Sequence, residues 1–368
     1  MHLSQLKLFN FKNYSEAHFR FSKQLNCLTG SNGSGKTNVL DAIYYLAFSK
    51  SYFSSQDIQN IRHDEQIFSI DGVFENNNMQ QTVHLAVQRG NKKQLLVNNN
   101  EYQKFSEHIG NYPLVIIAPD DIGLIQQRSA ERRRFMDGFI SQLDKLYLND
   151  LLQYNRTLEQ RNYLLKQFYD KRPGSLPDQN LLDTYNRSLS KTGTALYEKR
   201  KEFLKEFIPI FKKIYENISK SRETTDLIHI SDLHAGSFDK LLEESEEADL
   251  ALQRTTKGVH RDDLEFFISG YSLKRFGSQG QQKSFIIALK LAQFEYLDNK
   301  TQIKPLLLLD DIFEKLDGER LKILLEMIAD ERFGQIFISD THEERLKEVF
   351  DKMDVEVRYF SIENGILK

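Results

Sequence analysis

The sequence contains one cysteine, Cys27, among its 368 residues. A single cysteine cannot form a disulfide within the chain, so the fold must be held by its packed core, and this length is enough for two lobes. Cys27 lies in an apolar segment, where a thiol usually acts as a small core side chain. We therefore expect a packing role for Cys27 and no redox role.

Long apolar runs are missing as well. No segment approaches the ~18 consecutive apolar residues of a membrane span. The first residues, 1–14, alternate in polarity as a strand does and contain no signal-peptide core. These two absences predict a cytoplasmic protein with no membrane partner.

The sequence also lacks an excess of positive charge. The 50 Lys and Arg residues are outnumbered by 53 Asp and Glu residues, which gives a net charge of −3. The overall charge therefore does not indicate nucleic-acid binding, which often appears as a basic excess. It does not exclude such binding, because a local basic face is sufficient.

A glycine-rich segment lies between two apolar patterns near the N-terminus. Residues 30–37 read GSNGSGKT and match the P-loop pattern G-x-x-x-x-G-K-[ST] at each fixed position. The apolar run 25–28 predicts a strand before it, and the periodic run 39–46 predicts a helix after it. Glycines let several backbone N–H groups point at one anion, and the helix N-terminus favours negative charge. A flexible Gly/Ser turn is the alternative, but the flanking patterns favour a phosphate-binding loop.

The P-loop pattern assigns a role to each part of the segment. The backbone would surround the phosphates of ATP, Lys36 would reach the β- and γ-phosphates, and the Thr37 hydroxyl would ligate Mg²⁺. The candidate nucleotide-binding residues are Gly30, Ser31, Asn32, Gly33, Ser34, Gly35, Lys36 and Thr37.

A P-loop also needs a distant carboxylate for its Mg²⁺. The apolar run 306–309 ends in Asp310 and Asp311, at the end of a strand where open α/β sheets bind ligands. Asp310 would hold Mg²⁺, directly or through water, and Asp311 would orient or deprotonate the attacking water. The alternative is a solvated turn after a strand.

Lys36 and Asp310 are 274 residues apart, more than a compact P-loop domain needs. Between them, residues 129–218 carry two apolar-periodic runs separated by the Pro/Gly-containing turn 171–178, which predicts a helical hairpin or short antiparallel coiled coil. We expect an α/β head from residues 1–127 and 255–368, and a helical arm from 128–254. The acidic run 243–249 is interpreted as a solvated face.

Period-two and continuous apolar runs predict the strands of the head, and helical periodicity predicts two further helices. The predicted strands are 3–9, 17–21, 25–28, 67–74, 82–88, 94–97, 112–118, 264–268, 271–274, 305–309, 334–339 and 355–362, and the predicted helices are 284–297 and 319–329.

Residues 278–282, SQGQQ, open a predicted helix and resemble the signature motif of ATP-binding-cassette ATPases. The resemblance implies that Ser278, Gln279, Gly280 and Gln281 contact the nucleotide bound by a second subunit. A plain helix cap is the alternative. By the same resemblance, Leu316 and Asp317 correspond to the D-loop. His342, in the run 340–342, falls at the switch histidine, with an ordinary surface histidine as the alternative.

Several segments in order along nearly the whole chain resemble the RecF family, recombination and gap-repair ATPases related to the SMC proteins. They are LFNFKNY (8–14), the P-loop, APDDIGLI (118–125), ERRRFMD (131–137), GVHRDDL (258–264), SQGQQKS (278–284) and LLLLDDIFEKLD (306–317). The chain departs from the family pattern at Gln127, Ala130 and Lys315.

The resemblance implies an ABC/SMC-type P-loop ATPase head with an inserted helical arm. It also implies a weak, DNA-stimulated ATPase whose ATP-dependent homodimer closes on duplex DNA near gaps or single-strand junctions and opens after slow hydrolysis. The implied partners are RecR and, functionally, RecO and RecA. The alternatives are another SMC-like head, a transporter ATPase subunit, or a binding module with an inactive nucleotide site.

Basic residues at the base of the predicted arm and on its returning helix could contact DNA phosphates without reading sequence. They are Arg128, Arg132, Arg133, Arg134, Lys199, Arg200 and Lys201. Interleaved glutamates leave open that these cations form i,i+4 pairs on a solvated helix. The run 260–262, His-Arg-Asp, is either part of a nucleotide-responsive surface, as in the family, or a structural salt bridge.

Overall fold

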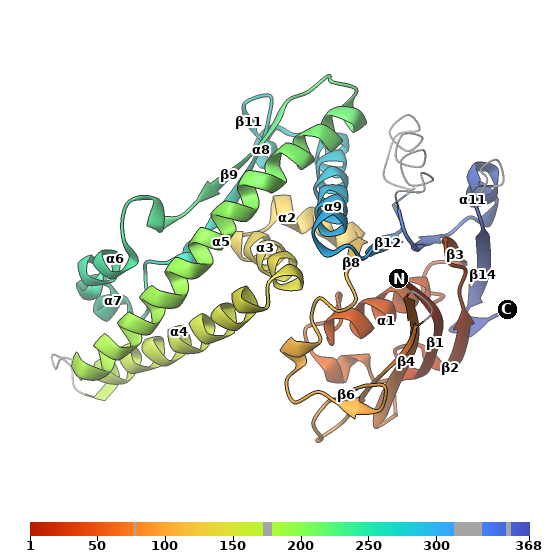
Figure 1. Ribbon diagram of the computed structural model, residues 1–368, viewed down its shortest axis with the longest axis horizontal. Helices are drawn as coiled ribbons and strands as arrows, with labels where there is room; N and C mark the ends of the chain where they lie inside the picture. The colour runs from red at the N-terminus through yellow and green to blue at the C-terminus, as the bar shows by residue number, and fades with distance from the viewer. Residues whose placement is uncertain (77–78, 172–178, 313–332, 351–354) are drawn as a thin grey trace. The chain divides into compact units, whose positions relative to one another are not determined.

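The computed structural model describes residues 1–76, 79–171, 179–312, 333–350 and 355–368 (Figure 1). The predicted helix 319–329, Lys315, Leu316 and Asp317 lie outside these residues, as does most of the predicted turn 171–178. None of the helices in the described ranges combines the length and the apolar composition that a membrane span requires.

The chain divides into two compact units. Unit 1 contains residues 1–122, 214–221 and 278–368, and unit 2 contains residues 123–213 and 222–277. Residues 255–277, which the sequence analysis placed in the head, therefore belong to unit 2. The physical reason is strand pairing, because β10 (Asp263–Ile268) pairs antiparallel with β9 (Thr225–Ile230).

Unit 1 contains two six-stranded sheets. The first is antiparallel, in the order β2-β1-β4-β5-β6-β7, and is built from the N-terminal part of the chain alone. The predicted strands 67–74, 82–88 and 94–97 are confirmed here and pair antiparallel in chain order. The strands are β1 (His2–Phe11), β2 (Tyr14–Arg20), β4 (Ile67–Asn76), β5 (Met79–Gln88), β6 (Gln94–Val97) and β7 (Asn100–Glu101).

The second sheet has the order β15-β14-β3-β13-β12-β8, and its strands from β14 to β8 are parallel. All residues of β3, β8, β12 and β13 are buried, as the continuous apolar runs predict for strands covered on both faces. The strands are β3 (Leu25–Thr29), β8 (Leu114–Ile117), β12 (Leu306–Asp310), β13 (Ile336–Asp340), β14 (Val357–Glu363) and β15 (Ile366–Leu367).

One apolar cluster joins the two sheets of unit 1. It includes Leu6 of the first sheet, Leu308 and Phe337 of the second, and Val39 of α1 (Lys36–Phe48). The other helical segments of unit 1 are η1 (Asp57–Asn60), η2 (Phe105–Glu107), η3 (Pro119–Ile122), α9 (Gln279–Thr301) and α11 (Glu343–Phe350).

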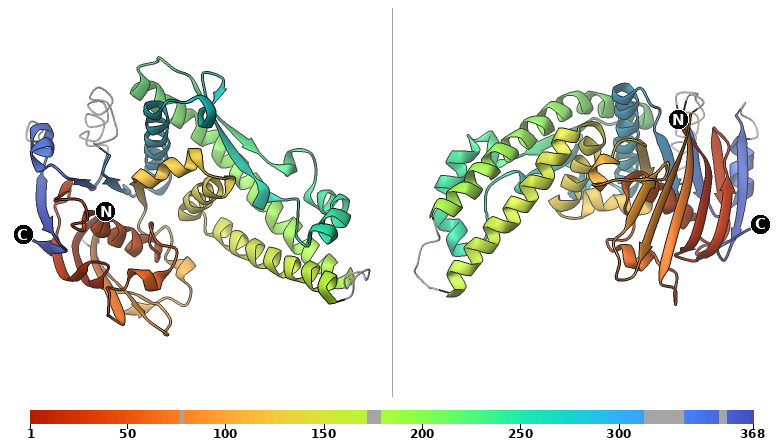
Figure 2. Two further views of the ribbon diagram at one scale, coloured as in Figure 1. Left: turned by 180° about the vertical axis from the view of Figure 1, so that it is seen from behind. Right: turned by 60° about the horizontal axis from the view of Figure 1, so that its bottom comes forward.

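Unit 2 is mainly helical, with a small antiparallel sheet in the order β11-β10-β9 (Figures 1 and 2). The first predicted helical run is interrupted: α3 (Ser129–Leu143) ends at Asp144, whose carboxylate accepts hydrogen bonds from the backbone N–H groups of Leu146 and Tyr147 and so starts a new helix. The long helices are α4 (Lys145–Lys171) and α5 (Gln179–Ser219), and the short segments are α2 (Gly123–Gln126), η4 (Asp232–His234), α6 (Phe238–Glu244), α7 (Glu246–Leu252), η5 (Val259–Arg261) and α8 (Leu273–Phe276).

Two expectations for unit 2 are wrong. The predicted strand 271–274 ends after Ser272 as β11 (Tyr271–Ser272), and Leu273 begins α8. The acidic run is not solvated throughout, because Asp249 is completely buried with its Oδ2 atom 2.7 Å from Nη1 of Arg161. An acidic residue fully buried against a cation cannot be recognised from charge pattern alone, since its partner lies 88 residues earlier.

Candidate nucleotide-binding site

The P-loop follows β3 and leads into α1, as the sequence predicts. Gly30 has φ 147° and Gly35 has φ 121°, values that L side chains rarely adopt. A Cβ atom at Gly30 would lie 2.1 Å from the carbonyl oxygen of Ile362, and one at Gly35 would lie 2.8 Å from the hydroxyl of Tyr14. The glycines are therefore required by backbone conformation and by the close approach of β14 and β2.

Side chains from the turn between β1 and β2 support the loop from outside. Asn13 Nδ2 donates to the Ser34 carbonyl at 2.9 Å, and the Tyr14 hydroxyl donates to the Gly35 carbonyl at 3.1 Å. Asn38 on α1 donates in turn to Asn13 Oδ1 at 2.7 Å. Asn13 and Tyr14 lie in the segment 8–14 that carried the family resemblance, but a sequence pattern could not show that their role is to fix the P-loop backbone.

The functional groups of the loop are buried but suited to an anion. Lys36 is 4% exposed, and its Nζ atom donates to the carbonyls of Gly30 and Ser31 at 2.8 and 3.0 Å. The buried hydroxyl of Ser34 has no hydrogen-bond partner within the described part of the chain. An ammonium group and a buried hydroxyl beside curled backbone fit a phosphate, which offers several acceptor oxygens.

The structure brings Thr37 and Asp310 into direct contact. The Thr37 hydroxyl lies 2.9 and 3.1 Å from the two carboxylate oxygens of Asp310, at the end of β12. The Ser339 hydroxyl donates to Asp310 Oδ1 at 2.6 Å. Burial raises the pKa of Asp310, against the opposing effect of these hydroxyl hydrogen bonds. A buried carboxylate whose hydrogen-bond partners among the described residues are hydroxyl groups fits a hard divalent cation such as Mg²⁺.

Asp311 and His342 lie at the same edge of the parallel sheet. Asp311 has φ 46°, and its backbone N–H donates to the Ser339 hydroxyl at 3.0 Å. His342 is exposed, and its backbone N–H donates to Asp340 Oδ1 at 2.7 Å. Because Asp340 pairs with Thr29 and Ser339 with Asp310, the ends of β3, β12 and β13 place these groups beside the P-loop.

The serine of the signature-like motif caps a helix. Ser278 is exposed and stands before α9, its hydroxyl accepts from Gln281 N at 3.2 Å, and Gln281 Oε1 accepts from Ser278 N at 2.8 Å. This capping box confirms the predicted helix start. Contact of Ser278, Gln279, Gly280 and Gln281 with another subunit's nucleotide stays a prediction.

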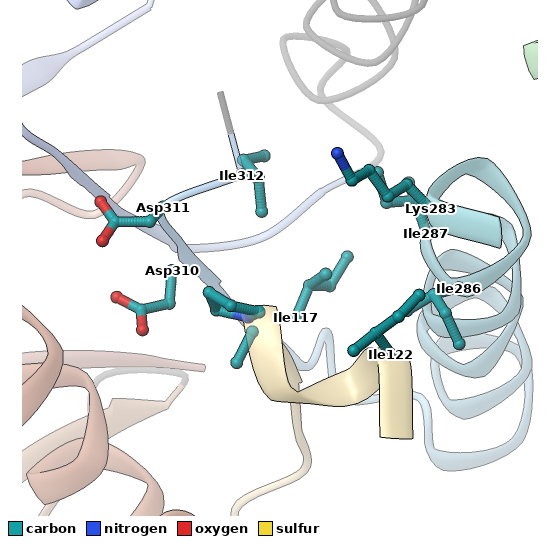
Figure 3. A pocket seen from close by; sticks show the side chains of 10 residues that line it. Ile117, Ile122, Lys283, Ile286, Ile287, Asp310, Asp311 and Ile312 are labelled. Atoms are coloured by element: carbon teal, nitrogen blue, oxygen red, sulfur yellow. The ribbon is translucent and has the colours of Figure 1, made fainter. Parts of the chain in front are cut away.

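A pocket separates the two carboxylates from α9 (Figure 3). Figure 3 shows Asp310 and Asp311 on one side and Lys283, Ile286 and Ile287 across from them. The lining is largely aliphatic, which would keep water away from one flank of the metal-binding group.

Buried polar groups also connect α1 with α9, and sequence reasoning did not identify them. Asp41 on α1 is fully buried and accepts hydrogen bonds from the Ser51 hydroxyl and the Tyr52 backbone, each at 2.7 Å. The Tyr52 hydroxyl donates to Asp121, which is 2.7 Å from Nζ of Lys290 on α9. Asp121 lies in the family-like segment 118–125, which was its only signal in the sequence.

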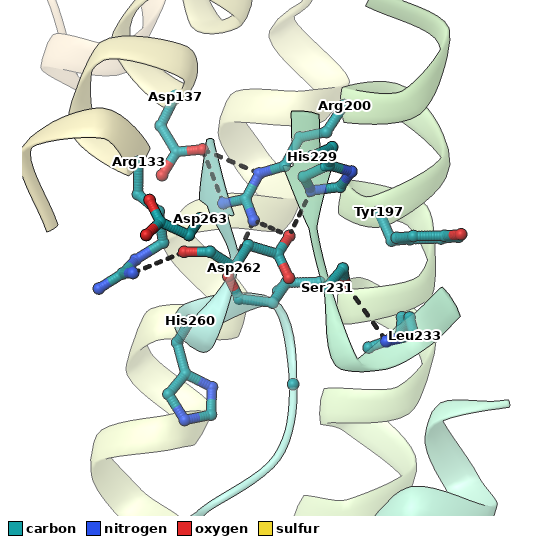
Figure 4. Close-up of polar contacts among 12 residues, drawn as sticks. Arg133, Asp137, Tyr197, Arg200, His229, Ser231, Leu233, His260, Asp262 and Asp263 are labelled. Carbon is teal, nitrogen blue, oxygen red and sulfur yellow. Dashed lines mark hydrogen bonds and ion pairs between the residues drawn. The ribbon is translucent and has the colours of Figure 1, made fainter. Parts of the chain in front are cut away.

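The proposed DNA-contacting cations fall into two groups. Arg132 and Arg200 are buried, so their assignment as DNA contacts is wrong. Arg132 forms two hydrogen bonds to Asp263, at 2.6 and 2.9 Å. Arg200 lies between Asp137 and Asp262, at 2.8 and 2.7 Å (Figure 4). A charge buried against carboxylates is not available to phosphates.

The other cations of that set are more accessible. Arg133 is partly buried and donates to Ser129 and to the Asp262 carbonyl. Four are exposed, although two of these have local partners: Arg134 pairs with Glu131 and Lys199 with Asp144. The exposed residues are Arg128, Arg134, Lys199 and Lys201. Their contact with DNA stays a prediction.

The segment 260–262 has a structural role. Asp262 is fully buried, and its Oδ2 atom accepts from Arg200 at 2.7 Å and lies 3.2 Å from Nε2 of His229 (Figure 4). Burial alone would raise the pKa of Asp262, but the His229 hydrogen bond and the Arg200 charge hold it below its usual value. Burial lowers the pKa of His260 to about 4, and its ring nitrogens bond Tyr154 and the Thr255 carbonyl.

A parallel sheet with a P-loop after one strand and a carboxylate pair after another defines a P-loop ATPase head. The sequence pattern of the RecF/RecN/SMC N-terminal domain family matches residues 2–368. The chain belongs to this family, and the full-length relatives described next place it with RecF. The resemblance and fold class stated from the sequence are therefore confirmed.

Proteins called RecF that are similar over nearly the whole chain support this family assignment. A protein called DNA replication and repair protein RecF from Flavobacterium johnsoniae is 49% identical over 362 residues, covering 98% of this chain and all of the relative. Another with that name, from Phocaeicola vulgatus, is 42% identical and covers 99% of this chain and 97% of the relative.

Solved structures agree. A RecF–ATP structure, described as a recombination mediator of the RecFOR pathway, superposes with a TM-score of 0.88 at 30% identity and covers all of this chain and 96% of that one. An Smc head from Pyrococcus furiosus has a TM-score of 0.57 at 17% identity, covering all of this chain and 95% of that one, and shows the fold alone.

Proposed function

We propose that the chain is an ATP-dependent DNA-binding protein of recombinational gap repair and replication restart. ATP and Mg²⁺ bind between two heads, and this homodimer closes on DNA near single-strand gaps. The single observation that carries the proposal is the Thr37–Asp310 contact at 2.9 Å, because it joins a P-loop hydroxyl to a strand-end carboxylate across 273 residues of sequence. A P-loop ATPase needs this pairing of oxygen ligands.

The roles of the residues follow from their positions. The backbone of residues 30–35 and the Ser34 hydroxyl hold phosphate oxygens, and Lys36 places its charge at the β- and γ-phosphates. Thr37 and Asp310 hold Mg²⁺, which when bound neutralises charge that develops on the phosphates. Asp311 orients or deprotonates the attacking water. His342, at the same edge of the sheet, acts in hydrolysis as the switch histidine.

The second subunit completes the site in this proposal. Ser278 and Gly280 at the N-terminus of α9 offer a hydroxyl and backbone N–H groups, which suit a γ-phosphate held by the partner head. Hydrolysis is weak and DNA-stimulated, and it reopens the dimer. The description of the RecF–ATP structure as part of the RecFOR pathway supports RecR as a partner and a functional connection with RecO, and we extend the proposal to a functional connection with RecA loading.

Sedimentation of the wild type and of Lys36→Arg with gapped DNA, with and without ATP, tests the proposal. We expect ATP to convert the wild type to a DNA-bound dimer and to leave Lys36→Arg monomeric, because a guanidinium cannot occupy the buried position of the Lys36 ammonium. Lys191→Arg, at an exposed lysine of α5 outside the predicted DNA contacts, is the matched control and should behave as wild type.

Ser278→Arg separates nucleotide binding from assembly. It should bind ATP as the wild type does yet fail to dimerise, since a large cation would replace the small cap residue. If ATP changes neither the self-association nor the DNA binding of the wild type, the ATP-dependent dimer on DNA is refuted. A binding protein that does not respond to ATP is then the better account.

A further inference from the structure

Two aromatic rings of unit 2 are exposed side by side. Tyr271 on β11 is 64% exposed and Phe276 at the end of α8 is 69% exposed. Their ring centroids are 5.8 Å apart with an interplanar angle of 66°. Leaving two neighbouring apolar faces in water is unfavourable, so an exposed aromatic pair marks a place where a partner can bind.

The two rings are held on a short, well-anchored segment. Leu273, between them in sequence, is completely buried, and the Gly277 N–H donates to the Leu273 carbonyl at 3.0 Å. A Cβ atom at Gly277 would lie 2.6 Å from Leu273 Cδ1, so the chain closes tightly behind Phe276. The backbone that carries the two rings is thus held in place, so little backbone entropy is lost when they bind a partner.

Positive charge accompanies the rings. Lys274 and Arg275 are both exposed, and Arg275 has no ion pair or hydrogen bond within the described ranges. Lys274 Nζ lies 3.4 Å from the Gln127 carbonyl, which brings the exposed Arg128 to the same region. Among the carboxylates of the adjoining elements α3 and β10, Glu131 pairs with Arg134 and Asp263 with Arg132, while Glu265 is exposed.

Exposed rings flanked by cations match single-stranded nucleic acid. Unpaired bases stack on aromatic rings, and cations beside them neutralise the phosphates. A base inside a duplex already has both faces covered by its neighbours and cannot stack on a protein ring unless it is turned out. Contact of the cations with duplex phosphates alone would not explain why the two rings are exposed beside them.

We propose that Arg128, Tyr271, Lys274, Arg275 and Phe276, here called the aromatic–basic patch, bind the single-stranded part of a gapped DNA. The rings stack with unpaired bases and the cations contact the flanking phosphates. This inference rests on the proposed function for DNA binding and adds to it the element that distinguishes a gap from intact duplex.

Fluorescence anisotropy at fixed ATP, with one labelled gapped DNA and one blunt duplex, tests the patch. For Tyr271→Ala/Phe276→Ala we expect at least about a tenfold loss of affinity for gapped DNA, the value of one base stack. Affinity for the duplex should change less than about twofold. Phe276→Trp should retain the gap preference, because an indole ring stacks at least as well.

Matched controls separate the effect from general surface changes. Tyr163→Ala removes a ring that is 65% exposed on α4 and should leave both affinities unchanged. Arg275→Ala should lower the slope of log affinity against log salt on gapped DNA by about 0.7, the value for one phosphate contact on a single strand.

The outcomes are distinct. An unchanged ratio of gapped to duplex affinity in the double variant overturns the patch while leaving the proposed function in place. A loss of ATP-dependent self-association with the DNA preference intact also overturns it, and assigns the rings to contact with a second copy of the chain. If wild type binds neither DNA with ATP present, the proposed function itself fails.

Discussion

Both units bury charged side chains, and the buried arginines of unit 2 are compensated differently from Asp310 in unit 1. In unit 2, Arg161, Arg200 and Arg132 each meet a carboxylate within 2.7 Å. In unit 1, Asp310 meets only hydroxyl groups among the described residues, and burial raises its pKa. Buried ion pairs thus hold elements together in unit 2, as Asp121 and Lys290 also do in unit 1 at 2.7 Å, whereas Asp310 has no ion-pair partner among the described residues.

This comparison separates stability from function. A compensated buried pair is destabilised when one partner is removed, because the other charge remains buried alone. A buried carboxylate that lacks a cation already carries that penalty, so removing its charge should cost little. Neutralising Arg200 in unit 2 and neutralising Asp310 in unit 1 should therefore have opposite consequences for folding and for ligand binding.

The largest effect is expected at Arg200. Arg200→Met would leave Asp262 and Asp137 without their cation and should lower the free energy of unfolding by about 3–5 kcal/mol. Chemical denaturation monitored by circular dichroism measures the change. The adjacent, exposed Lys199→Met removes only a surface pair with Asp144, 3.1 Å away, and should cost no more than about 1 kcal/mol. Equal costs for the two variants would show that the buried pair is not structural.

A second test uses the pH dependence of stability. The pKa of His260 is about 4 in the folded chain, against about 6.5 for a free histidine. Between these values the unfolded chain binds a proton that the folded chain does not, so stability is full above about pH 6.5 and falls as the pH drops to about 4. The loss attributable to His260 is about 3 kcal/mol.

His260→Gln keeps a hydrogen-bonding side chain but removes the titration. Its stability should decline less steeply over the same pH window than that of the wild type. His342→Gln, at an exposed histidine, is the control and should reproduce the wild-type curve. Parallel curves for wild type and His260→Gln would contradict the buried neutral state of this imidazole.

The smallest change in stability is expected at Asp310. Asp310→Asn removes a buried charge and keeps its shape, so the free energy of unfolding should shift by less than about 1 kcal/mol, in either direction. Mg²⁺-dependent nucleotide binding, measured by calorimetry, should be lost. A drop in stability comparable to that of Arg200→Met would mean that Asp310 is compensated within the chain and would remove the contrast between the units.

The elements that the sequence predicted well are those with local signals. Continuous apolar runs identified β3, β8 and β12, and the P-loop pattern located Lys36 and Thr37, because their signals lie in adjacent residues. The contact of Thr37 with Asp310 could also be predicted from the sequence, because a P-loop that binds Mg²⁺ requires a distant carboxylate.

The features that could not be predicted from the sequence depend on contacts between residues far apart in the chain. Arg132 and Arg200 have the composition of a basic surface, yet their partners Asp263 and Asp262 lie 131 and 62 residues away. The division between α3 and α4 was hidden because the apolar period continues through Asp144. Burial of a charged residue is decided by the tertiary fold, so charge patterns alone assign it to the surface.

The strand order of the second sheet has a consequence for synthesis on the ribosome. The first sheet needs only residues 2–101, so it can form early. β3, at residues 25–29, has as its two neighbours strands that begin at Ile336 and Val357. At a synthesis rate of roughly 5–20 residues per second, these neighbours are made on the order of 15–60 seconds after β3. Throughout that interval the P-loop strand has neither of its native neighbours, so we expect a nascent chain to bind nucleotide only after β13 and β14 have been synthesised.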